Sequence, residues 1–125
     1  MREKTPEFFT LITDNVTEIR QSEGPFIMGP AKSIQRMGRI EFRNFAGQYS
    51  EYNVAGFLIH EATHISEQNR GLPYTKEAEI RAREEEIAFF RALERAEGCS
   101  FEEIIQFIEN EISMIRRGHL YRELP

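Results

Sequence analysis

The stretch from Val54 to His64 constrains the fold of this chain more than any other part of it. It begins with the apolar run VAGFLI and continues as HEATH, which places His60 and His64 four residues apart, with Glu61 directly after the first histidine. The apolar lead-in indicates a helix that is buried rather than exposed. In a helix, His60 and His64 project from one face about one turn apart. Because buried imidazole and carboxylate groups need polar partners, the fold must bring other side chains or a metal ion to this face.

A first helix and a small sheet are expected before this segment. Apolar residues recur at helical spacing from about residue 5 to about Gln21, which predicts the first helix. Residues 26–46 contain short stretches rich in β-branched and aromatic residues, interrupted by glycine and proline. Two or three antiparallel strands are therefore expected there, with a tight turn at Met37 and Gly38.

Three further helices are predicted after the sheet, and together these elements define an α+β fold. Capping and stop residues place the three helices at about residues 50–69, 75–97 and 100–117. At 125 residues the chain is long enough for one hydrophobic core and too short for a second. Residues 1–125 are therefore expected to form a single domain.

The composition argues against several classes of function. A formal net charge of −5 does not suit nucleic-acid binding, which usually requires a basic surface. No apolar run approaches membrane-spanning length, and the first residues do not resemble a secretory signal. Cys99 is the one cysteine of the chain, so no intrachain disulfide can form. We therefore expect a cytoplasmic protein with no nucleic-acid and no membrane partner.

The two histidines have the spacing at which imidazoles on one helix bind a single zinc ion. Glu61 lies roughly 100° around the helix from His60, where it can reach a water on the metal without being a ligand. Residues 60–64 match the H-E-x-x-H motif of zinc metallopeptidases. A catalytic zinc needs a third protein ligand. The helix predicted at residues 75–97 offers five candidates: Glu77, Glu79, Glu84, Glu85 and Glu86.

An H-E-x-x-H helix followed by a glutamate-rich helix resembles a very small gluzincin, similar to the minigluzincins and to the soluble catalytic core of Ste24/HtpX-type metallopeptidases. The resemblance implies a zincin-like domain that binds Zn²⁺ and hydrolyses peptide or unfolded-protein substrates, with Glu61 as general base. Residues 79–82 resemble the E-x-x-A pattern of the gluzincin glutamate helix. The implied zinc ligands are therefore His60, His64 and Glu79. Glu84 is the alternative third ligand, because its spacing from His64 is similar to that of thermolysin-like enzymes.

Several further residues are candidates for supporting roles. Glu86, two turns after Glu79, could hydrogen-bond a metal ligand, whereas Arg83 stands where those families often have an acidic residue. The strand expected at residues 39–45 could bind an extended peptide by strand addition, or could be an ordinary strand of the sheet. Gly56 indicates close approach of a strand or substrate, or close packing without functional meaning. Four residues are candidates for stabilising the oxyanion: Tyr74, Arg81, His119 and Tyr121.

Two other classes of function remain open. The chain could be a catalytically silent zinc-binding domain of zincin-like fold with a regulatory or interaction role. Alternatively, the histidines could be core residues of a helical interaction protein.

The tail at residues 118–125 raises a separate question about regulation. It could block the active-site cleft of its own chain, or of the second chain in a homodimer, with His119 or Glu123 reaching the zinc. The other interpretation is that Leu120 and Tyr121 cover the end of the core.

Overall fold

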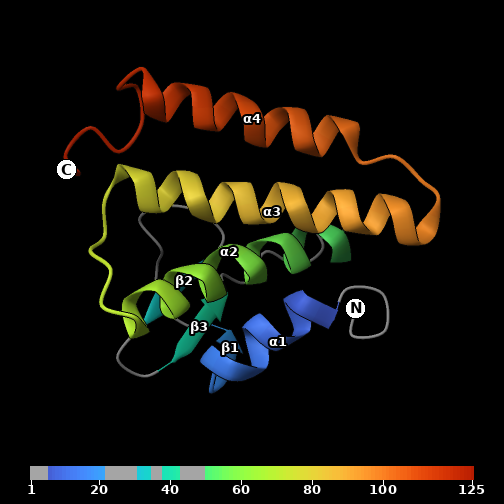
Figure 1. Cartoon of the computed structure of the whole chain (residues 1–125), viewed down its shortest axis with the longest axis horizontal. Helices are drawn as coiled ribbons and strands as arrows, with labels where there is room; N and C mark the ends of the chain where they lie inside the picture. The colour runs from blue at the N-terminus through green and yellow to red at the C-terminus, as the bar shows by residue number, and fades with distance from the viewer. Residues whose placement is uncertain (1–5, 22–30, 35–37, 43–49) are drawn as a thin grey trace.

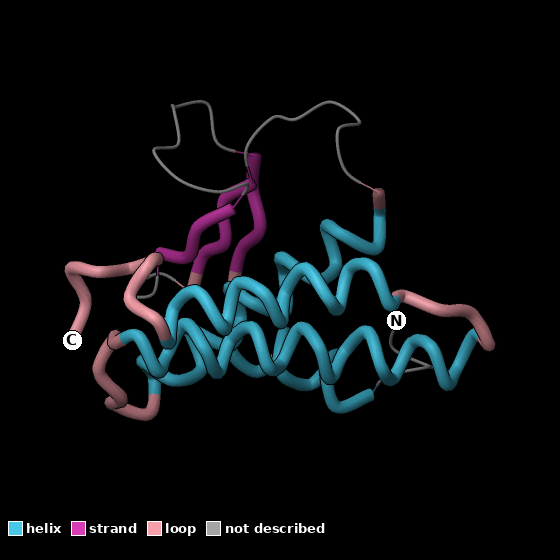
Figure 2. Tube along the Cα trace, turned by 90° about the horizontal axis from the view of Figure 1, so that it is seen from above, coloured by secondary structure: helices cyan, strands magenta, loops and turns pink. Residues whose placement is uncertain are grey.

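The computed structural model describes residues 6–21, 31–34, 38–42 and 50–125. Its elements follow the predicted order of one helix, three strands and three helices, and the predicted α+β class is confirmed. These elements are α1 (Pro6–Asn15), β1 (Glu18–Gln21), β2 (Ala31–Ile34), β3 (Arg39–Phe42), α2 (Glu51–Asn69), α3 (Lys76–Glu97) and α4 (Glu102–Arg116). Helix α3 packs between α2 and α4, and α1 packs against α2 (Figure 1). The strands project from one side of the helical layer, and β2 and β3 contact α2 (Figure 2).

The first helix is shorter than predicted. It ends at Asn15, and residues 18–21, expected to be its last turn, form β1 instead. The Asn15 side chain donates to the Leu11 carbonyl, and the backbone N–H groups of Thr17 and Glu18 both donate to the Gly38 carbonyl. Residues 16, 17 and 19 are β-branched, so they suit a strand as well as a helix. Pairing with a distant segment therefore decides their conformation.

The sheet is mixed, so the prediction of an antiparallel sheet is wrong. Its strand order is β1-β3-β2, with β1 parallel and β2 antiparallel to β3. Because β3 is paired on both sides, Arg39–Phe42 cannot take up an additional strand, which excludes peptide binding by strand addition at these residues. Gly38 lies in a turn with φ +60°. The rest of the predicted strand region, at residues 26–30, 35–37 and 43–46, lies outside the described residues.

Helices α2 and α3 begin and end where their capping residues predict. The Ser50 hydroxyl accepts the N–H of Asn53, whose side chain accepts the N–H of Ser50. The Thr75 hydroxyl accepts the N–H of Ala78 at the start of α3. Gly98 ends α3 in the left-handed conformation, with φ +70°. Each cap hydroxyl satisfies one of the free N–H groups in the first turn of its helix and fixes where that helix begins.

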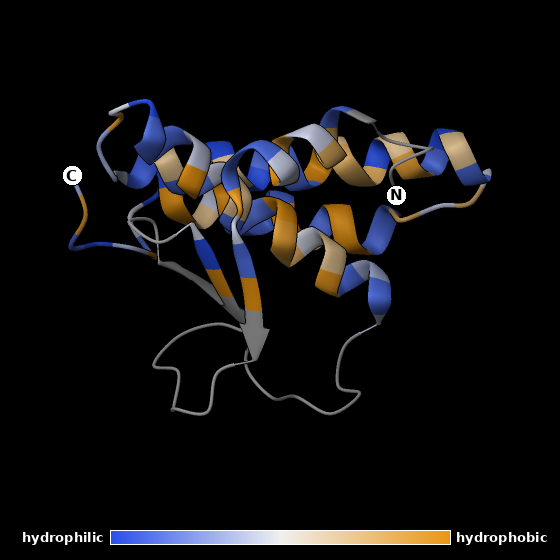
Figure 3. Cartoon of the chain, turned by 90° about the horizontal axis from the view of Figure 1, so that it is seen from below, coloured by the Kyte–Doolittle hydropathy of each residue, from blue (hydrophilic) through white to orange (hydrophobic). Residues whose placement is uncertain are grey.

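The main hydrophobic core lies among the four helices, which are amphipathic (Figure 3). Its largest fully buried members include Phe89 and Phe90 of α3 and Ile105 of α4. A Cβ atom on Gly56 would lie 3.0 Å from the Phe90 ring. Gly56 therefore allows α2 and α3 to pack closely, and its close neighbour is a helix rather than a strand. None of the described helices is both long and apolar enough to cross a membrane.

Candidate metal centre

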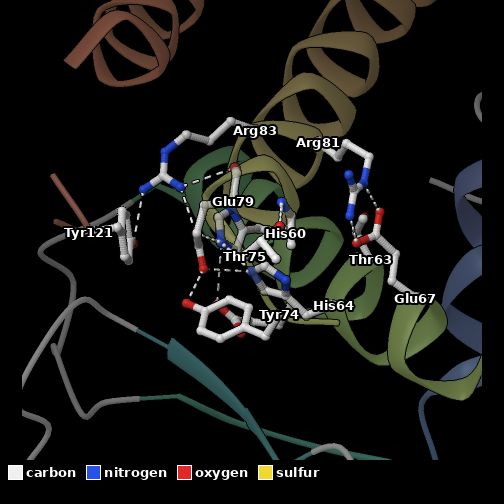
Figure 4. A network of polar contacts seen from close by, with 12 residues as sticks. His60, Thr63, His64, Glu67, Tyr74, Thr75, Glu79, Arg81, Arg83 and Tyr121 are labelled. Atoms are coloured by element: carbon white, nitrogen blue, oxygen red, sulfur yellow. Dashed lines mark hydrogen bonds and ion pairs between the residues drawn. The ribbon is translucent and has the colours of Figure 1, made fainter. Parts of the chain in front are cut away.

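Helices α2 and α3 bring His60, His64 and Glu79 together, and we call this cluster the His–His–Glu triad (Figure 4). The two helices run in opposite directions and are joined by a short loop, so the second half of α2 faces the first turn of α3 (Figure 1). The Nε2 atoms of His60 and His64 are 3.1 Å apart. Glu79 Oε1 lies 3.3 Å from His60 Nε2, and Glu79 Oε2 lies 3.0 Å from His64 Nε2.

The triad has the donor atoms and spacing that a zinc-like ion requires. Zinc is commonly bound by imidazole nitrogen and carboxylate oxygen at about 2.0–2.1 Å, and a tetrahedral arrangement then holds ligand atoms about 3.3 Å apart. The two Nε2 atoms are 3.1 Å apart, and each lies 3.0 to 3.3 Å from a carboxylate oxygen of Glu79, which is Oε1 for His60 and Oε2 for His64. One ligand atom from each of the three residues lies within 4.8 Å of the others. The side chains are 12%, 6% and 4% exposed for His60, His64 and Glu79 respectively. The triad therefore fits a bound metal ion.

Glu86 of α3 orients His60, as the sequence suggested. Its Oε2 lies 2.6 Å from His60 Nδ1. Because a carboxylate accepts, Nδ1 carries a proton, which leaves Nε2 as the ring nitrogen directed at the triad. Burial disfavours charged His60, but the Glu86 charge and hydrogen bonds to Glu79 and Glu86 outweigh burial and raise the pKa of His60 to about 10. The carboxylates of Glu79 and Glu86 thus make the space around His60 favourable for a positive charge, carried either by a proton or by a metal ion.

Glu79 is held by two residues outside the triad. Arg83 Nη1 donates to its Oε1 at 2.7 Å, and the Tyr74 hydroxyl donates to its Oε2 at 2.5 Å. Burial alone would raise the pKa of Glu79, yet hydrogen bonds from His60 and His64 hold this pKa well below its usual range. Glu79 is therefore an ionised carboxylate with a fixed orientation.

Tyr74 is the oxyanion candidate that lies against the triad. Its ring packs edge-on against His64, with centroids 5.5 Å apart. Burial and the hydrogen bond to Glu79 raise the pKa of Tyr74 well above its usual range, so the phenol keeps its proton and can donate. Arg81, another oxyanion candidate, instead pairs with Glu67: its Nε and Nη2 donate to the Glu67 carboxylate at 2.7 and 3.0 Å.

Glu61 lies beside the triad without belonging to it. Its Oε2 is 4.0 Å from His60 Nε2, and its side chain is largely buried. Among the candidate third ligands, Glu84 has a 55% exposed side chain and lies 3.9 Å from Arg116. Glu77 and Glu85 are also exposed. The structure therefore brings Glu79, and not Glu84, to the two histidines.

The tail reaches the surroundings of the triad but does not enter it. His119 and Glu123 are exposed, and the metal-capable cluster found in the described part of the chain contains neither. Within one chain, therefore, neither His119 nor Glu123 reaches the triad. Leu120 and Tyr121 pack against the main core, as the alternative interpretation predicted. Tyr121 also accepts a hydrogen bond from Arg83.

Arg83 is the neighbour whose role sequence reasoning missed. In the sequence it stands out only as a departure from the acidic residue that the resembled families often carry at this position. Its spacing four residues after Glu79 is a signal that could have revealed the pair, because such residues are neighbours on a helix surface. Its contacts with Glu111 and Tyr121 join segments far apart in the sequence and had no local signal.

A cavity in the described part of the structure lies away from the triad. It has a volume of about 600 Å³ and is lined by residues of α1, α2 and α3, among them Phe8, Thr63 and Arg81. A recess of about 10 Å³ beside His64 and Tyr74 lies at the triad. Of these two hollows in the described part of the chain, the one at the triad is the smaller, and the converging side chains define its chemistry.

No protein-family model matches this chain, and no curated protein or solved structure matches it. The class of the protein is therefore defined by its fold and by the geometry of the triad. The chain is an α+β protein in which two antiparallel helices form a His–His–Glu cluster able to hold a metal ion.

Proposed function

We propose that the protein is a zinc-dependent metallopeptidase of the gluzincin type that hydrolyses peptide or unfolded-protein substrates. The observation that carries the proposal is the convergence of His60, His64 and Glu79, with Glu61 beside them. The triad matches a catalytic zinc site with three protein ligands, which leaves a position for water or substrate. The H-E-x-x-H motif supports the same assignment.

The residues of the chain divide the chemistry among themselves. His60, His64 and Glu79 would hold the zinc, which would supply Lewis acidity to lower the pKa of a water toward about 7 and to polarise a carbonyl group. Glu61 accepts the proton of the attacking water and later transfers it to the leaving amine. The Tyr74 hydroxyl turns from Glu79 to donate to the carbonyl oxygen as that atom gains negative charge. Glu86 keeps the Nε2 lone pair of His60 directed at the triad.

An edge strand is the element that suits an extended peptide. Strand β3 is central, whereas β2 is an edge strand that contacts α2, the helix carrying both histidines. A peptide paired with β2 would run beside this helix and expose its backbone to the site.

The burial of the triad favours a second candidate function. Its three side chains are at most 12% exposed, and the recess beside His64 has a volume of about 10 Å³. A peptide bond must displace neighbouring groups to reach such a site. A catalytically silent zinc-binding domain with a regulatory role is therefore the alternative.

Replacing Glu61 by glutamine tests catalysis separately from metal binding. Zinc-loaded wild type is expected to cleave casein, and Glu61→Gln to retain about one zinc per chain with cleavage reduced about 10²- to 10⁴-fold, because the proton acceptor is lost. Glu84→Gln, on the exposed face of α3, is the matched control and should retain both properties. Elemental analysis measures the zinc, and release of labelled peptides measures cleavage.

Each alternative predicts a different outcome of this experiment. A wild-type chain that binds zinc but cleaves no substrate would support the silent zinc-binding domain. A chain that binds no zinc would leave the histidines as core residues of a helical interaction protein.

A further inference from the structure

Arg83 joins three segments of the chain next to the triad. Its side chain is 8% exposed. Nη1 donates to Glu79 Oε1 at 2.7 Å and to the Glu79 carbonyl at 3.3 Å. Nε donates to Glu111 of α4 at 3.4 Å. Nη2 donates to the Tyr121 hydroxyl in the tail at 3.2 Å (Figure 4). A buried guanidinium is stable only when its donors are satisfied, so Arg83 depends on all three segments.

Tyr121 holds an uncommon backbone conformation at this contact. Its φ is +54°, a value rarely adopted by residues with a side chain. The Arg83 guanidinium carbon lies 5.3 Å from the centre of its ring, which adds a cation–π contact to the hydrogen bond. Backbone strain of this kind persists only where surrounding contacts impose it. The contact with Arg83 is therefore a specific feature of how the tail docks.

The tail has a second attachment near Glu79. The Lys76 N–H, in the first turn of α3, donates to the Pro125 carbonyl at 2.9 Å. Between the two attachments, the Leu124 N–H donates to the Tyr121 carbonyl at 3.1 Å. Residues 118–125 thus dock against the same turn of α3 that carries the third ligand of the triad.

We propose that Arg83 is a positioning residue that couples Glu79 to the docked tail, so that metal binding and tail docking strengthen each other. Arg83 fixes one carboxylate oxygen of Glu79 and Tyr74 the other, and the tail fixes Arg83. A ligand already held in its binding orientation loses less freedom when the metal arrives. Linkage then requires bound metal to stabilise the docked tail by the same factor. The inference rests on the proposed metal site and adds its regulation.

Zinc affinity provides the first test, measured by competition with a chromogenic chelator. Tyr121→Phe keeps the ring but removes the hydroxyl that Arg83 contacts, and is expected to weaken zinc binding about fivefold. Arg83→Gln is expected to weaken it about 10- to 100-fold, as is typical when a residue supporting a ligand is removed. Arg91→Gln is the matched control, because Arg91 lies on the same helix and pairs with Glu94 and Glu102 away from the triad.

Trypsin cleavage after the exposed Arg122 provides the second test, because cleavage requires the tail to detach. Zinc is expected to slow this cleavage about fivefold in wild type and not in Tyr121→Phe, by reciprocity. A purely structural role for Arg83 would not make tail protection depend on zinc. Circular dichroism verifies that each variant folds, and if Arg83→Gln does not, Tyr121→Phe alone decides the result.

The outcomes separate this inference from the proposed function. Wild type that binds no zinc would refute the metal site, and the coupling with it. The coupling would be overturned by two results together: equal zinc affinity of wild type and Tyr121→Phe, and cleavage of the wild-type tail at the same rate with and without zinc. Both results would leave the metal site intact.

Discussion

At the scale of single residues, two glutamates of α3 show how burial distinguishes a ligand from a surface charge. Glu79 is 4% exposed and lies within 3.3 Å of both histidines, whereas Glu84 is 55% exposed and near Arg116. Five residues correspond to about 500° around a helix, which places the two carboxylates on different faces. Both residues are glutamate, but α2 covers only one of these faces.

Exchanging these two carboxylates for amides tests which of them binds the metal. Glu79→Gln is expected to weaken zinc binding by more than about 100-fold, because losing a ligand costs more than losing a residue that supports one. Glu84→Gln should leave the zinc dissociation constant unchanged, as measured by chelator competition. The opposite pattern would identify Glu84 as the third ligand.

At the scale of elements, the close pairing of α2 with α3 creates the site. The histidines and Glu79 belong to different helices, so their separation depends on how closely the helices pack. Gly56 and Phe90 meet in this interface, where a Cβ atom would lie 3.0 Å from the ring. Phe90 is 1% exposed and packs against Phe89 and Phe101, so its ring has little room to move.

Gly56→Ala is therefore expected to destabilise the protein. Alanine favours a helix interior by about 1 kcal/mol, but overpacking a full core costs about 1–3 kcal/mol. A net loss of about 1 kcal/mol is expected in urea unfolding with a chelator present. In a Phe90→Leu background the same substitution should cost less, because the ring is gone. Higher stability of Gly56→Ala in the wild-type background would show that the ring moves aside.

At the scale of the whole molecule, the metal would act as a crosslink between α2 and α3. The triad exists only when the two helices are docked, so zinc held there would favour the folded chain over the unfolded one. A free zinc concentration 1,000 times the dissociation constant would stabilise the folded state by about 4 kcal/mol.

Zinc should accordingly raise the unfolding temperature, and a chelator should reverse the rise. Differential scanning calorimetry of the same sample with zinc and then with excess chelator measures the effect. The double variant His60→Ala/His64→Ala should show no zinc-dependent shift. An equal shift in wild type and double variant would mean that zinc acts elsewhere on the chain.

Sequence alone determined helices α2 and α3, because their signals are local. Ser50, Thr75 and Gly98 mark helix ends through hydrogen bonds or dihedral angles that involve only near neighbours. The periodicity of a helix was also enough to place His60 and His64 on one face. The first helix was predicted too long and the sheet wholly antiparallel, because β1 depends on pairing with β3, about twenty residues further along the chain.

Only the tertiary structure decided how the metal centre is completed. Resemblance singled out Glu79, but its two distances to the histidines and the exposure of Glu84 come from the docking of α3 on α2. The contacts of Arg83 with Glu111 and Tyr121 span 28 and 38 residues of sequence. No periodicity reports contacts at such separations, because packing between elements, and not the conformation within any one of them, brings these side chains together.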